Sequence, residues 1–165
     1  MPTKTVSSSP PLPPEIEATM RRCRRLVSQR ALLAAGVATV PIPGIDWVTD
    51  VGILVKLLPR INEAFGLSPE QVDRLSPERR LVVYKAISAG GAMVIGKVIT
   101  RDLVLKLLKV VGVRLTTQQA AKYVPLAGQA VSAVLTYTAL RYVCEQHIRQ
   151  CAEVARQLAL PAPVE

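Results

Sequence analysis

The stretch ATVPIPGIDWVTD, residues 38–50, interrupts a hydrophobic run with two prolines and a glycine and then continues with two aspartates. Proline has no backbone N–H and clashes with the preceding helical turn, so a helix arriving from the N-terminal side is predicted to end near Val40. A second helix is predicted after the glycine, with Asp46 at its N-cap and Asp50 near its positive end. Helix-start chemistry therefore accounts for both aspartates, and we interpret the stretch as an elbow formed by Pro41, Pro43, Gly44 and Asp46.

The segment before this elbow, from Glu15 onward, has the period of an amphipathic helix. One face carries apolar side chains, at Ile16, Met20, Cys23 and Val27. Arginines fan out on the opposite side, at Arg21, Arg22, Arg24 and Arg25. Arg30 departs from this pattern, because its position is near the apolar face. Two interpretations stay open: a solvated face of a bundle helix, or a basic surface that lies on anionic lipid.

Several signals predict further helix starts after the elbow. Pro59 is expected to kink the second helix or to divide it in two. Two Ser-Pro-Glu sequences, at Ser68 and Ser76, have the chemistry of helix N-termini. The first predicts a short helix, and the second predicts a long apolar helix over residues 78–99. Thr100 marks a further start.

The elbow is then repeated. VPIPG at residues 40–44 is echoed by VPLAG at residues 124–128, which suggests an internal duplication with a second elbow at Pro125 and Gly128. The longest predicted helix follows. The 18 uncharged residues after Lys122 are at the lower limit for a membrane span, so spanning, re-entrant insertion and burial in a bundle all stay open. Small residues at a four-residue spacing predict close helix packing in two segments: Ala92, Gly96 and Thr100, and Gly128, Ser132 and Thr136.

The composition is that of one helical domain with a basic surface. The chain has 165 residues and a net charge of +9; 50% of its residues are hydrophobic, 4% are aromatic, and its mean hydropathy is +0.29. Such a chain suits an anionic membrane surface or an acidic partner, whereas nucleic acid is not expected because stacking aromatics are few. We predict an all-α bundle of about five to seven helices, in hairpins with two Pro/Gly elbows. It covers residues 15–159, after a disordered Pro/Ser-rich leader over 1–14 and before a tail over 160–165.

Signals for catalysis are weak throughout the sequence. GAMVIGKV, residues 91–98, matches a phosphate loop except at its last position, where Val98 replaces the Ser or Thr that ligates magnesium. The only histidine, His147, lies in a charged segment and is expected at the surface. The odd number of cysteines, without a C-x-x-C pair, predicts buried free thiols at Cys23, Cys144 and Cys151. No catalytic residue, cofactor or metal site is predicted, and we interpret the protein as non-enzymatic.

The elbow with its following helix, VPIPGIDWVTDVGILVKLLPRINEAFGL, resembles a bacterial helical domain of unknown function. That domain occurs at the C-terminal end of some Era-like GTPases and in small inner-membrane proteins. The matching positions are Pro41, Pro43, Gly44, Asp46, Gly66, Pro125 and Gly128, and the departures are Trp47, Arg60, Glu63 and Ala127. The later sequence KYVPLAGQAVSAVLTYTALRYV is similar to the EcsC family of membrane-associated bacterial proteins. Both resemblances, over residues 30–158, imply an all-helical, membrane-associated module whose GTPase partner, if any, is a separate protein.

Two hypotheses of function follow. The first is a non-enzymatic helical protein on the cytoplasmic face of a bacterial inner membrane. Its arginines would meet anionic lipid, and it would scaffold or regulate a membrane-bound partner such as a GTPase. The second is a soluble, cytoplasmic helical bundle that binds an acidic protein through the same arginines.

Overall fold

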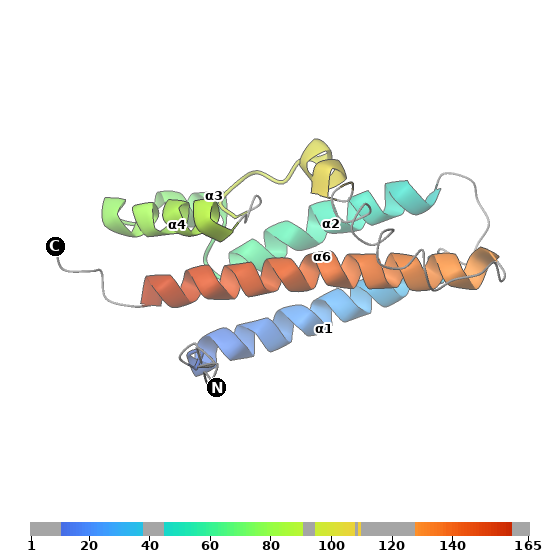
Figure 1. Ribbon diagram of the computed structural model, residues 1–165, viewed down its shortest axis with the longest axis horizontal. Coiled ribbons are helices and arrows are strands. Elements are labelled where there is room, and N and C mark those ends of the chain that lie inside the picture. Colours follow the sequence, from blue (N-terminus) through green and yellow to red (C-terminus); the bar gives the residue numbers. More distant parts are fainter. Residues whose placement is uncertain (1–10, 38–44, 91–94, 108, 110–127, 160–165) are drawn as a thin grey trace, which may run out of the picture.

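Figure 1 shows the computed structural model of the chain, which describes residues 11–37, 45–90, 95–107, 109 and 128–159. Side chains are described at all of these except 37, 45–50, 90 and 128–136. The described residues form helices and contain no β-strand: α1 (Pro14–Val37), α2 (Ile45–Ala64), α3 (Pro69–Asp73), α4 (Pro77–Gly90) and α6 (Gly128–Ala159). Residues 101–107 are helical as well. The prediction of an all-α bundle is therefore confirmed.

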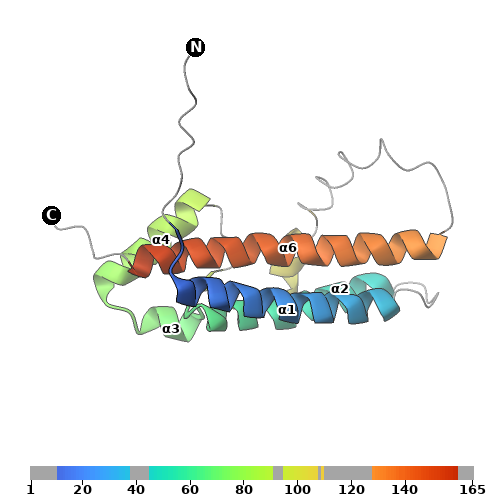
Figure 2. The same cartoon turned by 90° about the horizontal axis from the view of Figure 1, so that it is seen from below.

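The three long helices lie side by side along the long axis of the molecule (Figure 1). α1 runs antiparallel to both α2 and α6, and its most extensive contacts are with α6. α4 packs against α6 near the C-terminal end of that helix (Figure 2). The first turn of α1 and the last turn of α6 lie at the same end of the bundle, so the two ends of the described chain meet there.

The core lies along the predicted apolar stripe of α1. The four predicted positions, Ile16, Met20, Cys23 and Val27, are at most 9% exposed. They belong to one cluster with buried residues of the other two long helices, among them Leu54, Leu58 and Ile61 of α2 and Leu140, Cys144 and Ile148 of α6. Full burial of such an aliphatic side chain contributes about 1.5–3 kcal/mol, so this cluster holds the three helices together. The amphipathic period of the first helix and the burial of all three cysteines are confirmed.

Several helix ends are formed by the predicted residues. At α3, the Ser68 hydroxyl accepts a hydrogen bond from the Gln71 backbone N–H at 3.3 Å. The Gln71 side-chain oxygen accepts one from the Ser68 backbone N–H at 3.0 Å, which completes a capping box. Gly66 follows the end of α2 with φ of 72°, a left-handed conformation that reverses the chain there. α2 continues through Pro59, so this proline does not divide the helix.

The long apolar helix predicted over residues 78–99 is wrong. α4 ends at Gly90, and Gly96 has φ of 65°, which a right-handed helix cannot contain. Thr100 instead begins the next helical segment, because its hydroxyl accepts a hydrogen bond from the Leu103 N–H at 3.3 Å. Gly96 and Thr100 therefore do not share a helix, and the packing row proposed for them does not form. Ala92, the third member of that row, lies outside the described residues.

The elbows are described only at their edges. α2 starts at Ile45, so Asp46 lies inside the first helical turn and not at the N-cap; a carboxylate is still favoured there by the helix dipole. Gly128 is the first described residue of α6, so the second elbow stays a prediction. Ser132 and Thr136 lie in the first turns of α6. The remaining elbow residues lie outside the described residues: Pro41, Pro43, Gly44 and Pro125.

Candidate functional site

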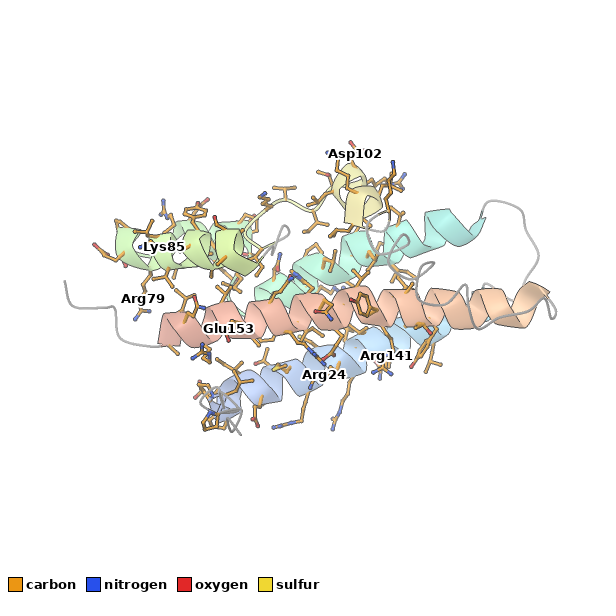
Figure 3. The ribbon with its side chains drawn as sticks, viewed as in Figure 1. Arg24, Arg79, Lys85, Asp102, Arg141 and Glu153 are labelled. Atoms are coloured by element: carbon orange, nitrogen blue, oxygen red, sulfur yellow. The ribbon has the colours of Figure 1, made fainter. Side chains whose placement is uncertain are left out.

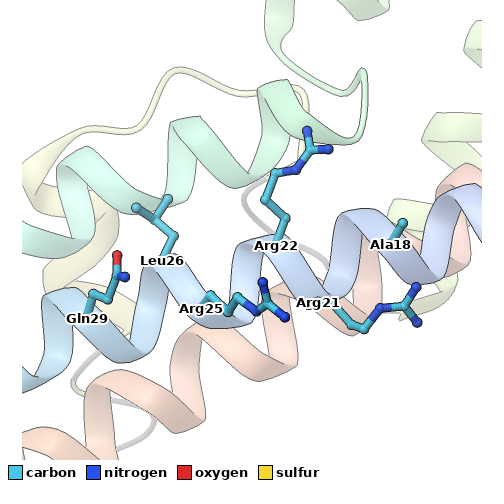
Figure 4. Close-up of a pocket in the computed structure, with 6 residues that line it drawn as sticks. All are labelled: Ala18, Arg21, Arg22, Arg25, Leu26 and Gln29. Carbon is cyan, nitrogen blue, oxygen red and sulfur yellow. The ribbon is translucent and has the colours of Figure 1, made fainter.

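The outward face of α1 carries the exposed arginines. Arg21, Arg22 and Arg25 line a shallow hollow of about 420 Å³, whose other walls are Ala18, Leu26 and Gln29 (Figure 4). All six residues come from α1 itself, because the opposite face of this helix is the one buried in the bundle. Arg21 makes one contact with Glu17 at 3.6 Å, while Arg22 and Arg25 form no ion pair with any described residue. Their charge is therefore directed to solvent or to a ligand.

Arg24 differs from the other three predicted arginines. Its guanidinium donates to both carboxylate oxygens of Glu145 in α6, at 2.9 and 2.6 Å. Figure 3 labels Arg24 on α1, which lies beside α6. Hydrogen bonding to Arg24 holds the pKa of Glu145 below its ordinary value, and the same bond raises the pKa of Arg24. Because Arg24 directly follows the buried Cys23, its side chain leaves α1 at the edge of the core and meets α6. It belongs to the bundle and not to the outward face.

Two exposed leucines continue the outward face toward the C-terminal end of α1. Leu32 and Leu33 are 62% and 65% exposed. Leu32 is seven residues beyond Arg25, which is two helical turns or about 10 Å along the same side. Basic side chains next to exposed large apolar ones are typical of a helix that lies in a membrane interface. Both leucines belong to the uncharged run after Arg30, and only the structure shows that they are exposed.

A buried polar cluster connects α2 and α6, and it overturns the expectation that His147 is a surface residue. His147 is 4% exposed and Asn62 is 1% exposed. The His147 Nε2 and the Asn62 Oδ1 are 2.8 Å apart. The Cys151 sulfur lies 3.5 Å from that nitrogen and 3.6 Å from that oxygen. His147 is four residues from both Val143 and Cys151, which are buried too, so its position belongs to the inner face of α6 despite its charged neighbours in the sequence.

The environment of this cluster disfavours nucleophilic chemistry. Burial lowers the pKa of His147 to about 4 and raises the pKa of the Cys151 thiol. Burial also raises the pKa of Cys144 to about 12. A reactive cysteine needs a stabilised thiolate, and here both the imidazole and the thiol are neutral. The cluster therefore acts as a hydrogen-bonded polar element of the core.

A second hollow, of about 380 Å³, lies between the end of α2, the start of α3 and residues 97–99. It contains Lys97, the lysine of the sequence that resembles a phosphate loop, together with Glu63 and Glu70. A phosphate loop follows a β-strand, whereas here α4 precedes it, and two carboxylates would repel a phosphate. This arrangement supports the rejection of a phosphate loop.

The described residues offer neither a metal site nor a membrane-spanning helix. No three His, Cys, Asp or Glu side chains among them gather in a way that could hold a metal ion. None of the helices in the described ranges has the length and hydropathy that crossing a bilayer requires. No family model, curated protein or solved structure matches this chain.

Proposed function

We propose that this protein is a non-enzymatic helical module that binds the anionic cytoplasmic face of a bacterial inner membrane through the outward face of α1. There it scaffolds or regulates a membrane-bound partner, such as a separate GTPase. The observation that carries the proposal is the order of side chains on this face, with exposed arginines followed by exposed leucines. The bacterial membrane and the GTPase rest on the resemblances of the sequence alone.

The expected strength of this attachment follows from the side chains involved. Each basic residue near an anionic leaflet contributes about 1 kcal/mol, and each leucine that transfers its exposed part contributes about 1–2 kcal/mol. Three arginines and two leucines together give about 5–7 kcal/mol, which corresponds to a dissociation constant between about 0.2 mM and about 7 μM. The protein is therefore expected to bind reversibly and to respond to salt.

Two neighbouring arginines provide a matched test. Arg25→Gln removes a charge from the outward face, and we expect it to weaken binding to phosphatidylglycerol vesicles about fivefold while leaving the free energy of unfolding unchanged. Arg24→Gln removes the same charge but breaks the Glu145 pair. It should lower the free energy of unfolding by about 1 kcal/mol, with a smaller effect on binding. Vesicle co-sedimentation and urea unfolding measure the two quantities. Equal binding losses in both variants would contradict a role of the outward face.

The leucines distinguish a membrane from an acidic protein. Replacement of Leu32 and Leu33 by serine should weaken vesicle binding further, because apolar surface no longer enters the interface. An acidic protein that contacts only the arginines would bind this double variant as well as the wild type. Unchanged vesicle affinity, or recovery of all the protein in the high-speed supernatant of gently lysed cells at low salt, would favour that second function.

A further inference from the structure

Three cations converge between α1 and α2, away from the outward face of α1. Arg30 of α1 and Lys56 and Arg60 of α2 line a hollow of about 60 Å³, whose other walls are Ile53 and Leu57. We propose that this hollow is a binding site for a phosphate group. Because the site is separate from Arg21, Arg22 and Arg25, it adds selective recognition of phosphate to the general attraction of the outward face to anions.

The backbone positions of these three basic residues are fixed, because each lies next to a buried residue of α1 or α2. Lys56 and Arg60 are one turn apart on α2, and they flank positions whose side chains are fully buried, such as Leu57 at 3% exposure. Arg30 immediately precedes Ala31, which is 1% exposed, so its side chain leaves α1 at the border of the interface with α2. This is why Arg30 did not fit the pattern of the other arginines in the sequence. The core holds both helices in place, so the three basic side chains start from fixed backbone positions around the hollow.

The charge of this site is not balanced within the described protein. Arg30, Lys56 and Arg60 form no ion pair or hydrogen bond with any described residue, and no carboxylate lines the hollow. Arg24, in contrast, is paired with Glu145. Like charges one helical turn apart destabilise a helix, and a third across the interface adds to the repulsion. A bound anion supplies a counter-charge that the described side chains around the hollow do not provide.

The chemistry of the side chains around the hollow favours a phosphate group. Two planar guanidinium groups with one ammonium are typical of phosphate recognition. Since all three cations are exposed, the rest of the ligand can extend into solvent. The phosphate can therefore belong to a lipid headgroup or to a soluble compound.

Binding of a soluble phosphate compound is tested with inorganic phosphate alone. At constant ionic strength, replacing chloride by phosphate should raise the Tm of the wild type. The triple variant R30Q/K56Q/R60Q should need at least about tenfold more phosphate for the same rise, because charge-assisted hydrogen bonds are lost. The matched control R74Q/R79Q/K85Q removes the same charge from exposed positions at the C-cap of α3 and in α4, and it should respond like the wild type. Should the triple variant fold poorly, Lys56→Gln alone serves the same comparison.

Binding of a lipid headgroup is tested with two kinds of vesicle of equal surface charge. One contains phosphatidic acid, whose phosphate is terminal, and the other contains phosphatidylserine. A preference for phosphatidic acid that R30Q/K56Q/R60Q loses and R25Q keeps assigns the site to a headgroup. A phosphate response without this preference assigns the site to a soluble phosphate compound. Absence of both effects, or identical effects in the triple variant, overturns the site. If R25Q loses vesicle binding but keeps the phosphate response, the result supports the role of the outward face and leaves the phosphate site intact.

Discussion

His147 shows how strongly burial in the fold changes the protonation of one side chain. Its ring is sealed between α2 and α6, where the Asn62 Oδ1 is 2.8 Å from Nε2. The Nδ1 has no hydrogen-bond partner among the described residues. The proton therefore belongs on Nε2, which donates a hydrogen bond to the Asn62 oxygen. In this tautomer the Nδ1 carries no proton, so the atom without a partner is an acceptor and not a buried N–H donor. Protonation of Nδ1 would place an unpaired charge in the core, and this is why the pKa is depressed.

This histidine makes stability depend on pH. Its folded pKa of about 4 is below the unfolded value of about 6.5, so the unfolded state binds the proton more readily. The stabilisation is present above pH 6.5 and is lost as the pH falls toward 4. Between pH 7.5 and pH 5 the free energy of unfolding should fall by about 2 kcal/mol, as measured by urea unfolding.

The control for this prediction is His147→Gln, which can still donate to Asn62 but does not titrate. Carboxyl groups of the unfolded chain titrate mainly below pH 5, so they contribute little in this window. The variant should therefore show an almost flat stability between pH 7.5 and pH 5. A wild type as flat as the variant would mean that water reaches the ring.

Among the elements, α2 offers two glycines with opposite roles. Gly52 lies inside the helix and Gly66 follows its end with φ of 72°. An added Cβ would meet no atom within 4 Å at either position, so sterics with neighbours do not decide the outcome. Gly52→Ala should raise the free energy of unfolding by about 0.5–1 kcal/mol, while Gly66→Ala should lower it by about 1–2 kcal/mol. Urea unfolding of the two variants gives the signs, and equal signs would contradict the assigned end of α2.

The helix starts were predictable where local chemistry decides them. Ser68 and Thr100 both accept backbone hydrogen bonds as their sequences indicate, because a cap needs only neighbours within three residues. The end of α4 was missed, since the apolar residues after Gly90 are compatible with a continued helix. The turn at Gly96 places Ile95 in the core at 1% exposure, and only the packing of the bundle selects that conformation.

At the scale of the whole molecule, α1 and α6 close the bundle by joining distant parts of the chain. Cys23 of α1 and Cys144 and Cys151 of α6 are at most 3% exposed within this arrangement. A thiol reagent such as DTNB should therefore react with the native protein only as fast as the bundle opens, and with all three thiols at once in urea. Cys23 is the diagnostic residue, because rapid modification of it alone in the native state would show that α1 detaches by itself.

The sequence by itself determined the helical class, the buried stripe of α1, several caps and the arginine-rich face. Each depends on periodicity or on contacts within a few residues. Only the tertiary structure decided that Arg24 pairs with Glu145, that His147 is buried against Asn62, and that Arg30 joins Lys56 and Arg60. The pair of Arg24 and Glu145 depends on the register between α1 and α6. The two other arrangements depend on the registers that α6 and α1 adopt against α2. A register is chosen by the summed packing of many apolar side chains, so no local pattern encodes it.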